Sequence, residues 1–359
     1  MPAQNVPLHK LGRDGPSVPA LGLGLMPLSH EVYGSVMPEE DQLAFLDRAC
    51  ELGATFWDSA DLYGGSEALI GKWFKRTGKR SDIFLATKFG FVKGSPSLAV
   101  DSSGEYCKTA CAESLRLLET DCIDLCHQPG DPLDYMHHAD TKTPIEQTMR
   151  ALKELQEEGK IKHIGLSSIS SKTLRRAYKI APVAAVQVEY SPFVLDCETE
   201  AGTNLLAACR ELGVAVVTAC PLGRGILTST YAKGGPVGDE KDMRSKVMPR
   251  FMEGNRDKNT KLVAKFQDMA ERKGCTVSQL ALAWLLKQGD DIFPIPGTKR
   301  IKYMEENWGA LLVKLSDEED AEVRNFVEKV EIAGSYMPPK FEAYIYRDTP
   351  EEGAVSERV

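Results

Sequence analysis

The sequence alternates eight times between a short run rich in β-branched and aromatic residues and a longer segment with apolar residues at helical spacing. Several runs, such as VAVVTAC at 214–220, are apolar on both faces, which favours parallel strands covered by helices. Eight strand–helix units over about 300 residues match the (β/α)8 barrel in count and length. The predicted strands cover residues 20–24, 54–60, 82–88, 122–126, 162–168, 183–190, 214–220 and 291–297.

An open, doubly wound parallel sheet is the competing fold. That fold usually carries a G-x-G-x-x-G turn directly after its first strand, whereas GLGLMP at 22–27 lacks the third glycine and is followed by a loop. We therefore predict an α/β chain folded as a (β/α)8 TIM barrel. It forms a single domain over 1–359, with a core of about 8–330 and a tail at 332–359. The segment 9–24 predicts an N-terminal β-hairpin that turns at Asp14-Gly15 and closes the N-terminal mouth of the barrel.

Charge and composition exclude several classes of partner. The chain has 44 Lys+Arg against 52 Asp+Glu, a net charge of −8, and it contains no Lys/Arg-rich run. We therefore expect no nucleic-acid partner. Its apolar stretches are shorter than the roughly 18 residues that span a bilayer, so we expect no membrane partner and a cytoplasmic location. The nine cysteines form no C-x-x-C pair, which favours reduced thiols and no metal site. The oligomeric state stays open.

Polar residues follow the predicted strands at the end where barrels place their catalytic groups. Each has a simpler explanation by itself, because an Asp or Ser at a strand end is more often a helix cap. In strand order they are Asp58 and Tyr63, Lys88, His127, His137 and His138, Ser167 and Ser168, Gln187 and Tyr190, Cys220, and finally Thr298, Lys299 and Arg300.

Asp58, Tyr63 and Lys88 together form a plausible proton donor. Lys88, held by Asp58, would place a positive charge beside the Tyr63 phenol. An ammonium group favours phenolate, so it would lower the tyrosine pKa from its usual value of about 10. Such a group is suited to protonating the alkoxide that develops when a carbonyl is reduced.

The residues after the eighth strand predict a phosphate site. Gly297 to Arg300 are expected to open a helix, where backbone N–H groups and the helix dipole favour an anion. Two cations beside that helix start would give such an anion charge-assisted hydrogen bonds. A basic helix start on a solvated face is the alternative.

Six motifs give the chain a family resemblance. It resembles the aldo-keto reductases, in the branch with many fungal and bacterial members, from about residue 8 to 330. The resemblance implies a barrel that binds NADPH/NADP+ without a Rossmann turn and reduces an aldehyde or ketone, with hydride from the nicotinamide and a proton from Tyr63. The motifs are FWDSADLYG at 56–64, ATKFG at 86–90, IGLSS at 164–168, VQVEYS at 186–191, PLGRGIL at 221–227 and IPGTKRIKYMEEN at 295–307.

The resemblance also implies roles for individual residues. Asp58, Tyr63 and Lys88 fall on catalytic positions. Ser167 and Gln187 would bind the carboxamide, with Ser168 in a place usually held by Asn or an acid. Among the implied cofactor residues, Leu222, Gly223 and Arg224 match the loop that covers the pyrophosphate. Lys299 and Arg300 would take the 2′-phosphate, and Glu306 and Asn307 would contact the adenine. The other implied cofactor residues are Gly24, Met26, Asp58, Ser167, Ser168, Gln187, Gly297 and Thr298.

The region after the fourth strand departs from the family pattern. Residues 127–134 look like an insertion, and removing them makes His137 the match for the catalytic histidine. Proline lacks the N–H that a central strand needs, so Pro129 and Pro132 favour a strand that ends at Cys126 and an excursion that returns at Tyr135. His127 as the catalytic histidine, and a displaced and weakened site, are the alternatives.

A second departure lies at Ala219, where relatives commonly place an aromatic that stacks on the nicotinamide. We therefore expect weaker binding of that half of the cofactor. Together the two departures raise a second hypothesis, an NADPH-binding regulatory or scaffold protein with little turnover. The identity of the aldehyde or ketone is not determined by the sequence.

Overall fold

Eight parallel strands form one sheet in chain order, from β3 to β10, in the computed structural model, which describes residues 6–92, 95, 99–128, 140, 142–339 and 345–353. The first strand also meets the segment after the last one, because Gly24 forms a parallel bridge to Gly297 and the Gly22 N–H donates to the Pro294 carbonyl at 2.8 Å. The sheet is therefore closed, which confirms the predicted barrel and makes the open-sheet alternative wrong. The strands are β3 (Leu23–Gly24), β4 (Phe56–Asp58), β5 (Phe84–Lys88), β6 (Ile123–His127), β7 (Ile161–Ser167), β8 (Ala185–Glu189), β9 (Ala215–Ala219) and β10 (Ile292–Pro294).

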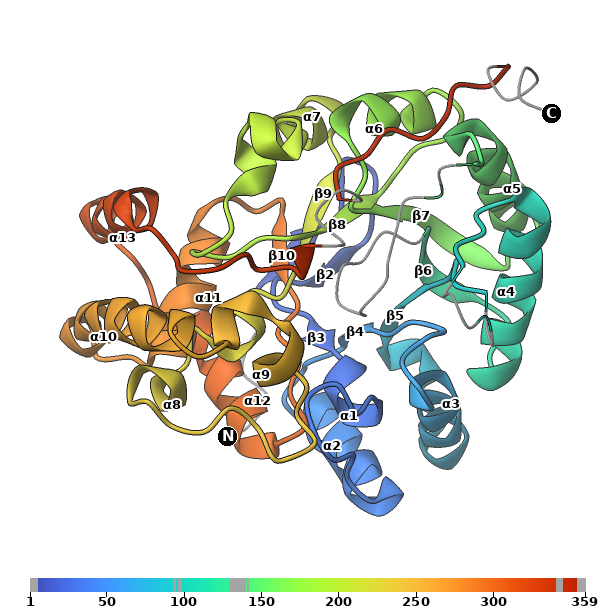
Figure 1. Ribbon diagram of the computed structural model, residues 1–359. Coiled ribbons are helices and arrows are strands. Elements are labelled where there is room, and N and C mark those ends of the chain that lie inside the picture. The colour runs from blue at the N-terminus through green and yellow to red at the C-terminus, as the bar shows by residue number, and fades with distance from the viewer. Residues whose placement is uncertain are drawn as a thin grey trace.

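Helices surround the strands on the outside (Figure 1). Those between or after the strands are α2 (Glu39–Glu51), α3 (Ser66–Thr77), α4 (Gly104–Leu117), α5 (Ile145–Glu157), α6 (Ser171–Tyr178), α7 (Leu205–Leu212), α10 (Asn255–Lys273), α11 (Val277–Lys287) and α12 (Ile301–Trp308), followed by α13 (Asp317–Lys329). Short loop helices are α1 (Met26–Ser29), α8 (Ser229–Ala232) and α9 (Arg244–Val247). The 3-10 turns are η1 (Arg80–Asp82), η2 (Asp196–Glu198), η3 (Glu200–Gly202), η4 (Gly223–Gly225), η5 (Pro249–Phe251) and η6 (Gly309–Leu312). Side-chain caps fix several starts, and Thr276 and Ser316 form capping boxes.

The predicted N-terminal hairpin is present and closes one end of the barrel. Strands β1 (Leu8–Lys10) and β2 (Ser17–Pro19) pair antiparallel. Leu11 and Val18 extend from the hairpin into an apolar cluster inside the barrel with residues from the strand interiors. The other end of the barrel is left for polar groups.

Alternation along the strands places a layer of polar side chains just above that apolar cluster. In β4, β5 and β6 the inward residues two positions beyond Phe56, Ala86 and Leu125 are Asp58, Lys88 and His127. Neighbouring strands add Ser167 from β7 and Gln187 from β8.

Strand β6 does not end at Cys126 as the prolines predicted. His127 pairs with Lys88 on one side and Gly165 on the other, and the Gln128 N–H still donates to the Gly165 carbonyl at 3.1 Å. The predicted excursion over 127–134 is therefore wrong at its first residue, because the ladder keeps its hydrogen bonds until the chain reaches a proline. Residues 129–139 lie outside the described part, so the rest of that prediction is not tested.

The structure gives two further checks on the sequence. All nine cysteines are free thiols, and burial raises the pKa of Cys107 and Cys126 above the usual range. In the described part of the chain, no helix has both the length and the apolar character needed to cross a bilayer.

Leu11→Ala tests the closure of the barrel by the hairpin. Leu11 is fully buried, so we expect a loss of about 2–5 kcal/mol in the free energy of unfolding, measured by urea denaturation. Leu8 in the same hairpin is 60% exposed, and Leu8→Ala is the matched control with an expected change below about 0.5 kcal/mol. Equal effects of the two substitutions would contradict a packed closure.

Candidate active site

A buried ion pair lies at the centre of the polar layer. The Lys88 ammonium donates to Asp58 Oδ1 at 2.6 Å and to the Ser59 carbonyl at 2.8 Å. The second carboxylate oxygen of Asp58 accepts from Gln187 Nε2 at 2.8 Å. Both charged side chains are at least 96% buried, so each needs the other and these hydrogen bonds to offset the loss of water.

Tyr63 is held over this pair by the loop that follows β4. Beyond the end of β4 the loop continues parallel to β5, through bonds from the Ser59 N–H to the Ala86 carbonyl and from the Asp61 N–H to the Lys88 carbonyl, both 2.9 Å. The Tyr63 ring then lies 4.8 Å from Lys88 Nζ, measured to the ring centroid. The predicted contact between the lysine and the tyrosine is therefore present.

His127 contributes a buried neutral imidazole next to the pair. Its ring packs against Gly165, where a Cβ would stand only 2.4 Å from Nδ1, so only glycine leaves room for it there. Nδ1 lies 3.3 Å from the Leu166 carbonyl, which can only accept, so Nδ1 carries the proton. Burial is the main reason that the pKa of His127 falls to about 4. Nε2 is then an acceptor, and it has no partner among the residues that the structure describes.

Close to Asp58, two more buried polar atoms have no hydrogen-bond partner among the described residues. Ser167 Oγ and Gln187 Oε1 make no hydrogen bond to any described residue, and their residues are register partners on β7 and β8. A buried unpaired polar atom costs about 1–3 kcal/mol, which favours a ligand that satisfies it. A primary carboxamide has a carbonyl that accepts and an NH2 that donates, so it matches this hydroxyl and this amide oxygen.

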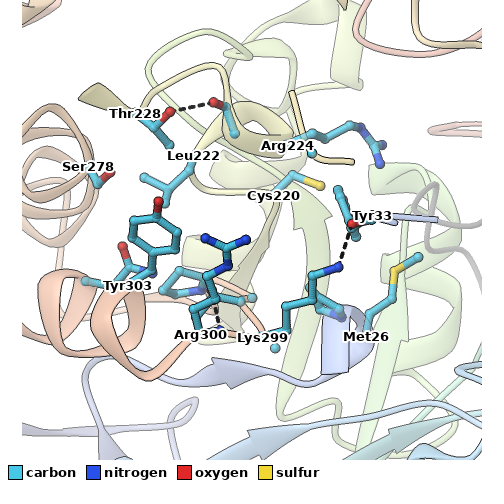
Figure 2. Close-up of a pocket in the computed structure, with 18 of the residues that line it drawn as sticks. Met26, Tyr33, Cys220, Leu222, Arg224, Thr228, Ser278, Lys299, Arg300 and Tyr303 are labelled. Atoms are coloured by element: carbon cyan, nitrogen blue, oxygen red, sulfur yellow. Dashed lines mark hydrogen bonds between the residues drawn. The ribbon is translucent and has the colours of Figure 1, made fainter. Parts of the chain in front are cut away.

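An elongated cavity of about 430 Å³ runs from the ion pair across the C-terminal ends of β9 and β10 to α12. Asp58, Tyr63 and Met26 line one end, and Glu306 and Asn307 line the other. Figure 2 shows the middle, where Leu222, Arg224 and Thr228 stand on one side and Lys299 and Arg300 on the other. Gly24 and Gly297 line the cavity where their backbones meet, and a Cβ on Gly24 would lie 2.9 Å from the Ile295 carbonyl.

The basic end of the cavity differs in detail from the prediction. Helix α12 begins at Ile301 with Arg300 as its N-cap residue, so Gly297 to Lys299 lie in the preceding loop and do not open the helix. Pro296 and Gly297 cannot easily start a helix while Gly297 bridges to β3. Lys299 donates to the Tyr33 and Ser35 carbonyls at 2.9 and 2.7 Å, and burial lowers its pKa. Arg300 stays exposed over the Tyr303 ring and is available to an anion.

Residues 236–244 form a strap across the cavity that the sequence did not reveal. Asp239 accepts from the Ser35 N–H at 2.9 Å, and Arg244 lies 4.9 Å from the Tyr33 ring centroid while paired to Asp242. The strap thereby ties the β9 side of the cavity to the loop after β3. Tyr33, Asp239 and Arg244 all line the cavity.

Glu189 is a further residue that sequence reasoning missed. It lies two positions beyond Gln187 on the inward face of β8 and pairs with Arg224 at 2.8 Å, with both side chains almost fully buried. The alternation of inward and outward residues along 183–190 could have predicted that Glu189 lies on the same inward face as Gln187. Arg224 adopts a positive φ of 58° where it forms this pair.

Most of the predicted residues therefore meet at one cavity. Ser167, Ser168, Gln187, Gly223 and Lys88 are buried beside it rather than lining it. His137 lies outside the described residues. The predicted residues that line the cavity are Gly24, Met26, Asp58, Tyr63, Leu222, Arg224, Gly297, Thr298, Lys299, Arg300, Glu306 and Asn307.

Comparisons with known proteins agree with one another. The sequence model of the Aldo/keto reductase family matches residues 20–328. The aldo-keto reductase yakc of Schizosaccharomyces pombe, whose name carries NADP(+), is 47% identical over 350 residues, which cover 96% of this chain and 98% of that protein. The aldo-keto reductase str7 of Strobilurus tenacellus is 46% identical over 337 residues, covering 92% and 94%.

Solved structures show the same fold. A thermostable aldo-keto reductase, Tm1743, described in complex with the inhibitor epalrestat, superposes with a TM-score of 0.69 at 26% identity, covering 89% of this chain and 99% of that one. The glycerol dehydrogenase AKR11B4 of Gluconobacter oxydans superposes with a TM-score of 0.75 at 24% identity, covering 92% and 96%. The second likeness concerns the fold alone.

The buried imidazole makes stability depend on pH. Between about pH 6.5 and the His127 pKa of about 4, the unfolded chain binds a proton at this position and the folded chain does not, so stability falls as the pH drops. Between neutral pH and about pH 4.5, we expect the unfolding free energy of the wild type to fall by about 2–3 kcal/mol more than that of His127→Gln, which has no imidazole to protonate. His9→Gln, at the hairpin, is the control. A wild-type pH dependence in His127→Gln would contradict the neutral buried state.

Proposed function

Because the chain belongs to the aldo/keto reductase family, we propose that it is an NADPH-dependent oxidoreductase that reduces an aldehyde or ketone to the alcohol. The observation that carries this proposal is the Tyr63 ring held against the buried Lys88–Asp58 pair at the inner end of a long cavity whose outer end is basic. A proton donor at one end and an anion site at the other match a reductase with a phosphorylated cofactor.

The residues present fit NADPH. Ser167 Oγ and Gln187 Oε1 would bind the carboxamide, since both are buried and lack partners among the described residues. Arg300 and Lys299 would take the 2′-phosphate, and Glu306 and Asn307 the adenine. Leu222 to Arg224 would lie along the pyrophosphate, with Gly24 and Met26 beside the nicotinamide. When bound, the reduced nicotinamide supplies the hydride for carbonyl reduction.

The chain's own residues supply the proton. Tyr63 Oη would donate it to the oxygen of the carbonyl as negative charge develops there. Lys88 holds a positive charge beside the ring, so a phenolate left after donation is stabilised. Asp58 fixes the lysine in place, and Gln187 fixes the other carboxylate oxygen. We do not assign Asp58 a role as a proton acceptor, because its two oxygens already accept hydrogen bonds from Lys88 and Gln187.

A histidine would orient the carbonyl oxygen. His137 is the residue that the family pattern assigns, and His127 is the described imidazole closest in the fold to Lys88 and Asp58, with electrostatic coupling to both. A neutral His127 with its proton on Nδ1 presents Nε2 as an acceptor. In that state it can hold a hydroxyl or water but cannot donate to a carbonyl. We therefore keep His137 for the contact with substrate and assign His127 to the polar layer around the Lys88–Asp58 pair.

Tyr63→Phe tests the proton donor. We expect kcat for aldehyde reduction to fall by roughly 10²–10⁴ while the Kd for NADPH changes less than about twofold, since only the donated proton is lost. NADPH consumption with a panel of aromatic and aliphatic aldehydes measures turnover. Tyr303→Phe, at the adenine end of the same cavity, is the matched control and should keep full activity.

Two results would count against this assignment. Equal turnover in Tyr63→Phe and wild type would remove Tyr63 as the donor. NADPH binding by the wild type without turnover on any aldehyde or ketone would favour the regulatory or scaffold protein.

Arg300→Gln tests the cofactor preference. We expect the affinity for NADPH to fall about tenfold to a hundredfold with little change for NADH, because only NADPH carries the 2′-phosphate that a charge-assisted hydrogen bond would hold. Lys302→Gln, an exposed cation two residues further on α12, is the control. Parallel losses for both cofactors would place the phosphate elsewhere.

A further inference from the structure

The C-terminal segment 345–353 returns to the mouth of the barrel and pairs with the residues after β7. The Tyr346 N–H donates to the Ser168 carbonyl at 3.0 Å, and the Ser170 N–H donates to the Arg347 carbonyl at 3.2 Å. Ile169 and Arg347 form a parallel bridge, and Ser170 Oγ donates to the Asp348 carboxylate. Figure 1 shows this red segment passing beside α6 toward α5.

A second set of bonds fixes the segment to the helices on either side. Thr349 is buried, its N–H donates to Thr173 Oγ1 on α6, and its Oγ1 accepts from the Ile145 N–H at the start of α5. Arg176 donates to the Thr349 and Pro350 carbonyls at 2.8 and 2.6 Å while forming a two-bond pair with Glu146. The segment is therefore bonded to the structure along its length, through its backbone at Tyr346, Arg347, Thr349 and Pro350 and through several of its side chains.

The residues after β7 that pair with this segment lie next to the proposed carboxamide site. Ser168 has a positive φ of 48°, a left-handed conformation that a residue other than glycine adopts only when its surroundings hold it. Its N–H donates to the Gln187 carbonyl at 2.9 Å and its carbonyl accepts from Tyr346, so Ser168 is held between β8 and the C-terminal segment. The preceding residue, Ser167, carries a buried hydroxyl that has no partner among the described residues.

We propose that the segment 345–353 is a positioning element for the nicotinamide half of the cofactor. It acts through Ser168: by holding that residue in its left-handed conformation, it keeps the Ser167 hydroxyl directed beside Gln187 Oε1. The proposal rests on the proposed function, because it needs the carboxamide to bind at Ser167 and Gln187. Ser168 has a structural part here, whichever side chain is usual at its position in the family.

The adenine end of the cavity is independent of this segment. None of the residues 345–353 lines the cavity, whereas Arg300, Glu306 and Asn307 line it and lie on α12 or at its start. A loosened segment should therefore weaken the binding of one half of the cofactor and leave the other half unchanged. A segment that only stabilised α5 and α6 would lower the unfolding temperature without separating the two halves.

Tyr346→Pro removes the hydrogen bond between the segment 345–353 and Ser168, and it also removes the buried Tyr346 ring. Proline has no N–H to donate to Ser168, and it cannot adopt the positive φ of 55° that Tyr346 has. Asp348→Ala is a milder second variant that removes the bond from Ser170 Oγ. Glu352→Ala is the control, since Glu352 pairs with exposed Arg150 at the far end of the segment.

Calorimetric titration with NADPH and with adenosine 2′,5′-bisphosphate, which lacks the nicotinamide half, measures the effect in the full-length protein. We expect Tyr346→Pro to bind NADPH about tenfold more weakly, corresponding to the loss of one or two hydrogen bonds, and the bisphosphate within about twofold of wild type. Asp348→Ala should show a smaller change in the same direction, and Glu352→Ala none.

The remaining outcomes separate the two proposals. Unchanged NADPH affinity in Tyr346→Pro and Asp348→Ala, or equal losses for NADPH and the bisphosphate, would overturn the positioning role. If Tyr346→Pro does not fold, Asp348→Ala alone decides, by its loss of affinity for NADPH compared with its loss of affinity for the bisphosphate. Failure of the wild type to bind NADPH more tightly than the bisphosphate would instead contradict the proposed function, because the nicotinamide half would then make no contact.

Discussion

The buried pair of Lys88 and Asp58 is the interaction on which the mouth of the barrel depends. Two opposite charges taken out of water are tolerated only when their geometry is good and their remaining hydrogen-bonding groups are satisfied. The structure meets that demand with three bonds that join β4, β5 and β8, at 2.6, 2.8 and 2.8 Å. Removing either partner would leave an uncompensated charge. The residues around the pair, including Tyr63 and His127, are therefore placed with respect to a fixed charge.

A gradient of polarity extends from this pair along the cavity. At the inner end the ion pair is neutral overall, and the buried tyrosine and imidazole lie beside it. Toward α12 the charges become exposed, and Arg300 lies in the solvent with its guanidinium over Tyr303. An extended ligand with a flat, weakly polar end and a phosphate-bearing end fits this arrangement better than a compact one. This is why the comparison with NADP(+) reductases and the geometry of the chain support the same proposal.

The sequence predicted the barrel well, because its signals are local and repeated. Eight β-rich runs, each followed by a segment with helical spacing, led to eight parallel strands, and Asp58, Tyr63 and Lys88 followed from their positions at strand ends. Three features could not be predicted, because they depend on contacts between distant segments. The strap at 236–244 is held by Ser35 and Tyr33, about two hundred residues earlier. The segment 345–353 is held by α5 and α6.

The third such feature is the end of β6. Pro129 signalled the end of that strand, but backbone bonds to β5 and β7 extend the ladder through His127, and Gly165 on the neighbouring strand leaves the room for its ring. The start of α12 was misplaced for a similar reason, since Gly297 is occupied in closing the barrel. In each case a bond across the sheet outweighed a preference of the local sequence.

The most direct test of the account is a crystal structure of the protein with NADP+ bound. The account predicts the carboxamide within hydrogen-bond distance of Ser167 Oγ and Gln187 Oε1, the nicotinamide beside Tyr63, and the 2′-phosphate against Arg300. A nucleotide lying with its adenine at Asp58 and Tyr63, or bound outside the cavity between the strap and α12, would contradict it.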